Sequence, residues 1–264
     1  MRRAAAFALP ALLLAGCAAA SQAPAQTDAL TIENRYPLEY ATQFTVDVCA
    51  GGYDLITIDG SRYLVVPEGA AAPANLDADI TVLQQPIQNI YLVSSSAMDP
   101  IISIGGLGAV ALSGTQAENW YLDAARTAME QGEIAYAGKY SAPDYETILS
   151  ADCGLAIENT MIYHTPEVKE QLEKFGVPVL VERSSYESDP LARMEWVKLY
   201  GILLGRTEEA ERIFDDAVQR IAPLLDEEPT GKTAAFFSIT SNNLATVRKG
   251  GDYVAKMIGL AGGS

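Results

Sequence analysis

Five short apolar runs alternate with helix-like stretches across the middle of this sequence, and the alternation constrains the fold more than any other feature. The runs are predicted as strands at residues 89–93, 109–112, 134–137, 155–157 and 177–181. The clearest helices between them are predicted at residues 117–130, 143–149 and 166–175. Short strands separated by helices favour right-handed βαβ crossovers and a parallel sheet covered on both faces. We therefore expect an α/β lobe.

Local signals place a hairpin before this lobe and fix the ends of one helix. Residues 43–66 read as extended, and Asp59 and Gly60 separate two β-rich runs, as in a tight type I′ turn. The helix at 166–175 begins with a proline, with Thr165 as its expected N-cap and Gly176 as its stop.

Two consecutive helices are expected after the last strand of the lobe. Asp189 is a good N-cap for the first, and the second begins at Thr207 and continues to residue 224. A strand at 233–239 and an amphipathic stretch at 253–260 follow. One strand and one helix cannot bury their own apolar faces, so this pair either completes the first lobe or begins a second lobe whose remainder is missing.

The N-terminus is predicted to be a secretory signal. Arg2 and Arg3 precede an apolar run that ends in "LAGC", which resembles the lipobox of bacterial lipoproteins, where cleavage precedes the cysteine and the new terminus is lipidated. Residues 1–16 would be removed, Cys17 would carry the lipid, and residues 17–28 would form a flexible tether. The alternative is an ordinary signal peptide with a chance cysteine.

Charge and cysteine content exclude some partners. The chain has 34 Asp and Glu against 18 Lys and Arg, and its basic residues are scattered, so nucleic acid and anionic membrane surfaces are poor partners. Cys49 and Cys153 lie in or beside apolar runs, and we expect buried free thiols; export would also permit a disulfide.

Familiar catalytic patterns are missing from the sequence. His164 is the only histidine, so a two-histidine metal site would need a partner chain, and GxSxG, SxxK, HExxH and CxxC do not occur. Gly106, Gly108 and Ala111 match GxGxxA, but a strand-like run follows, so a turn is the better interpretation. The residues favour capture of a ligand over its conversion.

Polar residues follow all five predicted strands, at the edge where open α/β sheets bind ligands. They are Ser94, Ser95 and Ser96; Ser113 and Thr115; Lys139, Tyr140 and Ser141; Glu158, Asn159 and Thr160; and Arg183, Ser184, Ser185 and Tyr186. Solvated turns and capping residues are the alternative for each single position.

Longer stretches resemble the substrate-binding lipoproteins of bacterial ABC importers that carry iron siderophores, haem or cobalamin. The resemblance rests on "YLVSSSAMD", "ALSGTQAENWY", "YAGKYSAPDYETIL", the run from "AIENTMIYH" to "LYGILLG", and "RKGGDYVAKMIGLAGG". It implies a monomer with no cofactor of its own, with two α/β lobes joined by a long helix and the ligand in the cleft between them. On this basis residues 29–186 are the first lobe, 187–226 the interlobe helix region, and 227–264 the start of a second lobe that is expected to be incomplete.

The resemblance also suggests site residues. The candidate ligand contacts are Ser95, Ser96, Trp120, Lys139, Tyr140, Asn159, Thr160, Arg183, Ser184 and Tyr186. The basic members could meet an anionic chelate, and the aromatic ones could stack on a flat ligand. Glu146 matches the glutamate through which such proteins dock on permease arginines; an ordinary acid near a helix N-terminus is the alternative. Arg193 and Glu195 are expected on the polar side of the connecting helix.

Two hypotheses from other classes remain open. One is an exported enzyme in which Glu158 and Glu182 act as general acid and base. The other is a structural lipoprotein with no small ligand, which a lack of any cleft at the strand ends would favour.

Overall fold

The computed structural model describes residues 30–225 and 227–264. The predicted signal at 1–16, Cys17 and all of the tether therefore lie outside the described residues. Within the described part, none of the helices combines the length and the apolar character needed to cross a membrane.

The five predicted strands form one parallel sheet, as expected. They are β6 (Ile90–Leu92), β7 (Val110–Ser113), β8 (Ala135–Tyr136), β11 (Ala156–Asn159) and β12 (Val179–Glu182). Their order is β12-β11-β6-β7-β8, and every neighbouring pair is parallel. All five strands therefore end at the same edge, which positions the candidate site.

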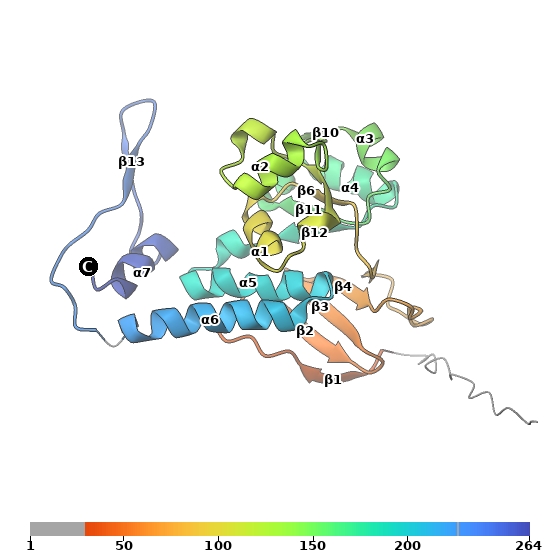
Figure 1. Cartoon of the computed structure of the whole chain (residues 1–264), viewed down its shortest axis with the longest axis horizontal. Coiled ribbons are helices and arrows are strands. Elements are labelled where there is room, and N and C mark those ends of the chain that lie inside the picture. The colour runs from red at the N-terminus through yellow and green to blue at the C-terminus, as the bar shows by residue number, and fades with distance from the viewer. Residues whose placement is uncertain (1–29, 226) are drawn as a thin grey trace, which may run out of the picture.

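Helices cover both faces of this parallel sheet (Figure 1). On one face, α3 (Tyr145–Ser150) and α4 (Pro166–Lys174) share a core with Tyr91 and Val179. On the other face, α1 (Met98–Ser103), α2 (Asp123–Glu130) and α5 (Pro190–Leu203) contribute to the largest apolar cluster. The predicted double cover is confirmed, although no bounds were predicted for α1.

A second, mixed sheet precedes the parallel one. Its strands are β1 (Ile32–Arg35), β2 (Phe44–Cys49), β3 (Tyr53–Ile58), β4 (Ser61–Val66) and β5 (Ile80–Gln84), paired in that order. The predicted hairpin is β3–β4, and Asp59 and Gly60 form its turn with positive φ of 49° and 82°. Sequence analysis predicted this hairpin but did not predict the sheet to which it belongs.

The two sheets share one core through α5. The ring of Phe44 on β2 meets that of Trp196 on α5 edge-on, with centroids 4.9 Å apart. The Tyr63 hydroxyl, on β4, donates a hydrogen bond to the carbonyl of Val179 on β12 at 3.0 Å. The mixed sheet therefore fixes the parallel sheet and α5 in place.

The region expected to connect two lobes consists of two helices lying side by side, α5 and α6 (Thr207–Leu225) (Figure 1). The approach is close, because a Cβ on Gly201 would lie 2.5 Å from the Cβ of Ala210. α5 is mostly buried, and α6 leads into residues 227–264. The expectation that residues 187–226 connect two lobes stays a prediction. The placing of Glu195 on a polar face is wrong, since Glu195 is fully buried.

Two further expectations need correction. The helix expected at 117–130 is broken: a 3-10 turn, η3 (Ala117–Asn119), and α2 are separated by extended backbone at Trp120 and Leu122. At α4, Thr165 occupies the N-cap but its side chain accepts no capping hydrogen bond. Gly176 does end that helix, with φ of 82°.

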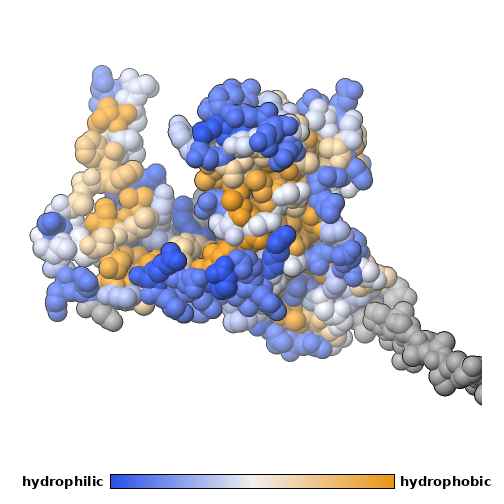
Figure 2. All heavy atoms as spheres, viewed as in Figure 1, coloured by the Kyte–Doolittle hydropathy of each residue, from blue (hydrophilic) through white to orange (hydrophobic). Residues whose placement is uncertain are grey.

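Residues 227–264 form a small unit beside the body. β13 (Phe237–Ile239) and β14 (Ala245–Val247) pair as an antiparallel hairpin, and α7 (Tyr253–Leu260) follows. The predicted strand is shorter than expected, and the predicted helix is confirmed. Figure 2 shows the surface hollowed between this hairpin and the body, with hydrophobic residues on both sides of the hollow.

The remaining short elements lie mainly at strand ends. They are the 3-10 turns η1 (Ser95–Ala97), η2 (Leu107–Ala109), η4 (Thr160–His164) and η5 (Ser184–Tyr186) and the short strands β9 (Gly138–Lys139) and β10 (Ala142–Pro143). Cys49 and Cys153 are buried free thiols, as predicted. The glycines at 105–108 form a turn that leads through η2 into β7, so the turn interpretation of GxGxxA is confirmed.

Candidate functional site

The 3-10 turns η1, η4 and η5 follow β6, β11 and β12, η3 follows β7, and β8 leads into the short strand β9, so these elements gather at the carboxyl edge of the sheet. The edge belongs to the side of the body that faces residues 227–264 (Figure 1). The guanidinium of Arg193, just beyond η5, lies 3.5 Å from the ring centroid of Tyr253 on α7. Predicted contacts from separate parts of the chain are thus brought to one side of the molecule.

The serines after β6 are divided between a structural and an exposed role. Ser94 and Ser96 both donate hydrogen bonds to the Glu182 carboxylate on β12, each at 2.8 Å, and the other carboxylate oxygen accepts from the backbone N–H of Ser184. This network links the ends of β6 and β12, which flank β11 in the sheet, and holds the edge together. Ser95 is exposed, and so is Ser96, although Ser96 also bonds Glu182.

The turn after β12 presents a tyrosine supported by an arginine. Tyr186 is 55% exposed, and the Arg183 guanidinium lies over its ring at 4.5 Å. Arg183 also pairs with Asp59 of the β3–β4 turn at 2.7 Å. Because Asp59 already compensates the charge of Arg183, Arg183 has less charge to offer an anionic ligand, and its ligand contact stays a prediction; Ser184 is buried rather than presented to solvent.

Trp120 is the clearest wrong prediction among the candidate contacts. Its ring is buried in the main core, and its Nε1–H donates to the hydroxyl of Ser113 at 3.2 Å. The extended backbone that breaks the expected helix turns the next side chain outward, because side chains alternate along extended chain. Tyr121 is consequently 97% exposed.

The other predicted contacts differ in their availability. Asn159 uses its side-chain oxygen to accept from the N–H of Met161, at 2.9 Å, and so caps η4. Thr160 is partly buried, and Tyr140 packs partly against the α3–α4 core. Lys139 on β9 is exposed. Asn159 is therefore better explained as a capping residue than as a ligand contact.

We define the exposed edge set as the strand-end side chains with substantial solvent exposure. It includes Ser95, Ser96, Lys139 and Tyr186, which were predicted, and Tyr121, Met161 and Tyr163, which were not. Helical periodicity concealed Tyr121, and the 3-10 turn η4 was unrecognised in "NTMIYH". The set is aromatic and polar, with one cation, and it can offer stacking surfaces and hydroxyl groups.

Glu158 on β11 is a buried carboxylate without a hydrogen-bond partner. It is fully buried, and neither carboxylate oxygen has a hydrogen-bond partner. Burial raises the pKa of Glu158 to about 8, from an ordinary value of 4.5. The side chain is therefore largely protonated at neutral pH, and no ligand in solvent can reach it.

Two more glutamates hold the chain that enters β2. Glu195 accepts the backbone N–H groups of residues 39, 40 and 41 at 2.7–2.9 Å and pairs with the ammonium of Lys198 at 2.8 Å. Glu187 accepts from the N–H groups of Thr42 and Gln43 and from the indole of Trp196. Sequence reasoning did not foresee these clamps, because a buried carboxylate has no local signature.

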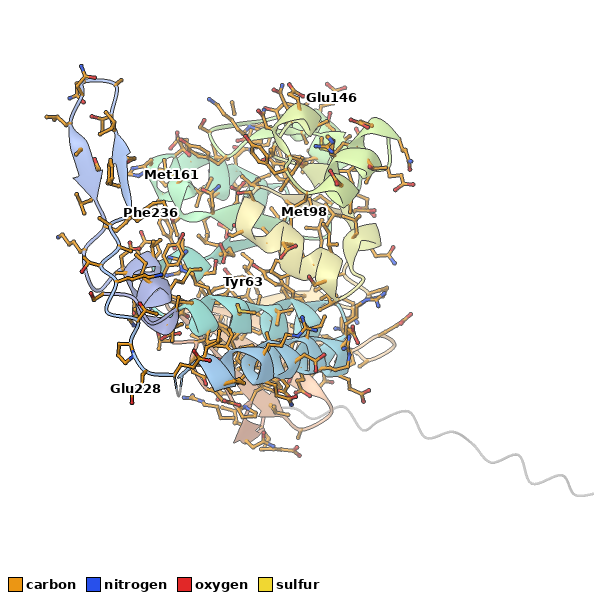
Figure 3. The ribbon with its side chains drawn as sticks, turned by 60° about the vertical axis from the view of Figure 1, so that its left-hand side comes forward. Tyr63, Met98, Glu146, Met161, Glu228 and Phe236 are labelled. Carbon is orange, nitrogen blue, oxygen red and sulfur yellow. The ribbon has the colours of Figure 1, made fainter. Side chains whose placement is uncertain are left out.

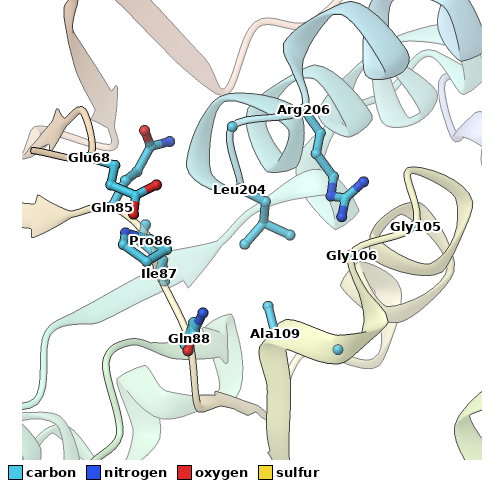
Figure 4. A pocket seen from close by; sticks show the side chains of 12 residues that line it. Glu68, Gln85, Pro86, Ile87, Gln88, Gly105, Gly106, Ala109, Leu204 and Arg206 are labelled. Carbon is cyan, nitrogen blue, oxygen red and sulfur yellow. The ribbon is translucent and has the colours of Figure 1, made fainter.

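A cavity of about 370 Å³ lies at the opposite end of the parallel strands (Figure 4). Gln88 precedes β6 and Ala109 precedes β7, and Leu204 and Arg206 close the far wall from the α5–α6 turn. None of the predicted ligand contacts lines it. The cavity is therefore separate from the strand-end site.

Glu146 points outward from the upper margin of the body (Figure 3). It lies in the first turn of α3 and is exposed, while the N-cap Asp144 accepts from the N–H of Thr147. A shallow hollow beside it is lined by Glu133 and Asp144 as well. This position is compatible with docking to a basic partner and equally with a solvated surface acid.

Comparison with known proteins shows the fold. No family model matches the chain. An uncharacterized lipoprotein of Methanocaldococcus jannaschii is 21% identical over 218 residues, which are 77% of this chain and 51% of that protein. The periplasmic haem-binding protein HutB of Vibrio cholerae superposes with a TM-score of 0.54 at 17% identity, over 67% of this chain and 65% of that chain.

Two further solved structures have similar folds. A possible iron-binding, periplasmic solute-binding protein of Staphylococcus epidermidis gives a TM-score of 0.51 at 14% identity, covering 66% of this chain and 65% of that one. Staphylococcus aureus SirA complexed with staphyloferrin B gives 0.50 at 16% identity, covering 67% and 58%.

The chain therefore has the fold of periplasmic binding proteins, as the resemblance predicted. It spans about half the length of the lipoprotein and less than two thirds of the solved structures that it matches.

Proposed function

We propose that this chain is an extracytoplasmic solute-binding protein that captures a metal chelate at the carboxyl edge of its parallel sheet and delivers it to an ABC permease. The chelate would be an iron siderophore, haem or cobalamin. The observation that carries the proposal is the exposed edge set, which lies where α/β folds bind ligands, on a fold shared with haem-binding and iron-binding proteins.

The chemistry of the edge set fits a large, partly flat ligand. Tyr121 and Tyr186 offer aromatic faces, and Ser95 and Lys139 offer a hydroxyl and a positive charge. Asp59 already neutralises Arg183, so Arg183 would support the Tyr186 ring instead of neutralising the ligand.

Titration of the full chain with haemin, a ferric siderophore and cyanocobalamin, followed by calorimetry, tests the proposal. We expect one of the three to bind, and we expect Tyr121→Ala and Tyr186→Ala each to weaken binding about tenfold through lost stacking. Phe175→Ala is the matched control, because Phe175 is a similarly exposed aromatic residue at the end of α4, just before the strand β12 begins. Equal effects of all three substitutions, or no binding of any solute, would contradict the proposal.

Membrane attachment and delivery form the second part of the proposal. A lipid on Cys17 would hold the protein at the membrane, and Glu146 would pair with a permease arginine. Radiolabelled palmitate incorporation into the wild-type chain but not into Cys17→Ser tests the anchor. Retention of the label after this substitution would rule it out.

The two competing hypotheses gain no support from the site. An acid–base pair would need reachable carboxylates, but Glu158 is fully buried and both oxygens of Glu182 already accept hydrogen bonds. A structural lipoprotein needs no ligand-binding edge. That hypothesis therefore does not explain the exposed tyrosines at the strand ends.

A further inference from the structure

The side chain of Arg193 joins the turn that carries Tyr186 to residues 227–264. Arg193, in the first turn of α5, donates from Nε to the carbonyl of Glu187 at 3.0 Å and from Nη2 to the carbonyl of Ser185 at 2.7 Å. These two carbonyls flank Tyr186 on both sides. Arg193 therefore fixes the backbone that presents this exposed aromatic ring.

The same guanidinium is stacked on the ring of Tyr253, with 3.5 Å between Cζ and the ring centroid. Tyr253 is the first residue of α7, and the N-cap of that helix, Asp252, accepts from the N–H of Val254 at 2.9 Å. A planar guanidinium can stack on an aromatic face while its N–H groups donate within its own plane. One side chain thus contacts the strand-end turn and α7 together.

A second contact lies on the same face of α7, one helical turn further on. Lys256 donates to the hydroxyl of Ser188 at 3.2 Å and lies 3.9 Å from the carboxylate of Asp189. Asp189 caps α5 by accepting from the N–H of Leu191. Both contacts from α7 therefore fall on the segment that follows Tyr186. Movement of α7 would change the position of this segment.

We infer that Arg193 is a positioning residue that couples the Tyr186 turn to helix α7, so that capture of solute at the strand ends and docking of α7 stabilise each other. The inference rests on the proposed function for its solute. It follows from linkage, because two events that both require Arg193 in one position favour each other. Tyr253 and Arg193 would thus influence solute affinity without touching the solute.

Hydrogen exchange of the full chain without any solute measures the coupling itself. We expect Tyr253→Ala to increase exchange of the amides at 184–187 by about tenfold, the effect of losing one well-ordered cation–π contact. Tyr253→Phe keeps the ring and is expected to leave these amides unchanged. Phe236→Ala removes another exposed aromatic ring from residues 227–264 and controls for the loss of a ring. Faster exchange in α7 alone would overturn the coupling.

Solute titration then measures the consequence for capture. With whichever of haemin, ferric siderophore or cyanocobalamin binds the wild-type chain, we expect Tyr253→Ala and Arg193→Lys to weaken affinity about three- to tenfold, because lysine cannot form the planar, two-carbonyl contact. Tyr253→Phe should restore wild-type affinity. Altered exchange with unaltered affinity would overturn the positioning role. Failure of all three solutes to bind the wild-type chain would count against the proposed function alone, since the exchange result decides the coupling without solute.

Discussion

Glu195 on α5 and Glu158 on β11 are both fully buried, but they differ in their hydrogen-bond partners. Glu195 has three backbone N–H donors and the ammonium of Lys198, which in turn lies over the ring of Phe214 at 4.3 Å. Glu158, on the α3–α4 side, has no hydrogen-bond partner for either oxygen. Burial alone therefore does not say whether a carboxylate stabilises a fold; its partners do.

The pKa values of the two groups shift in opposite directions for this reason. Burial acts to raise the pKa of Glu195, but Lys198 and the backbone donors outweigh it, and the pKa is lowered. Burial acts unopposed on Glu158 and raises its pKa to about 8. Glu195 should therefore stabilise the fold above its ordinary pKa and lose that contribution as the pH falls. Glu158 should weaken the fold as the pH rises from about 4.5 to 8.

Removal of Glu195 is expected to give the largest effect. Glu195→Ala leaves Lys198 buried without its partner and deprives the backbone at 39–41 of its acceptors, so the free energy of unfolding should fall by about 3–5 kcal/mol. Urea denaturation at pH 7 measures this. Glu209→Ala is the control, because Glu209 likewise pairs with a basic residue at i+3 on a helix, but its side chain is 41% exposed, so the substitution should change little. Similar losses in both variants would contradict the comparison.

Neutralisation of Glu158 should have the opposite sign. Glu158→Gln is expected to raise the free energy of unfolding by about 3 kcal/mol at pH 7, since the ionisation penalty grows by about 1.4 kcal/mol per pH unit above the unfolded pKa. At pH 4 wild type and variant should be alike, because the carboxyl is protonated in both the folded and unfolded chain. A pH-independent difference would show that the shape of the side chain, rather than its charge, is responsible.

Glu182 should give an intermediate result. It is bonded like Glu195 but has no cationic partner, so Glu182→Gln retains an acceptor and loses only the charge that strengthens the bonds from Ser94, Ser96 and the Ser184 N–H. We expect a loss of about 1–2 kcal/mol in thermal or urea denaturation. Ser96→Ala, which removes one of those donors, should cost less. A larger effect from Ser96→Ala would mean that the network depends on the serines.

Glu146 should give the smallest effect on stability. It is exposed, so Glu146→Gln should leave the urea midpoint unchanged. If the proposed docking role is correct, the same variant should lose binding to a reconstituted permease, whereas Glu133→Gln nearby should retain it. A stable variant that docks normally would remove Glu146 from the proposed interface.

Fold class and strand positions could be predicted because they depend on periodic burial, which sequence records directly. The five strands of the parallel sheet and the Asp59–Gly60 turn follow from local patterns. The mixed sheet could not be assembled in the same way, because β1 is exposed along its length and pairs with β2 through contacts that leave little apolar signal.

The candidate site was predicted less well than the fold. Its location at the strand ends follows from topology, but the direction of each side chain depends on tertiary contacts. A single break in the expected helix buries Trp120, the predicted contact, and exposes Tyr121 instead. Arg183 is neutralised by Asp59, in a turn 124 residues away in sequence. Such a partner has no sequence signal near the residue that it neutralises.

The indole rings of Trp120 and Trp196 are both buried, and each N–H is already bonded, to Ser113 and Glu187. Neither ring can contact a solute at the strand ends, so such a solute would quench them mainly by energy transfer, which requires that it absorb near the tryptophan emission. Haemin, cyanocobalamin and ferric siderophores are all coloured, so each would quench through space when bound. The two tryptophans would therefore report capture of the cargo without touching it.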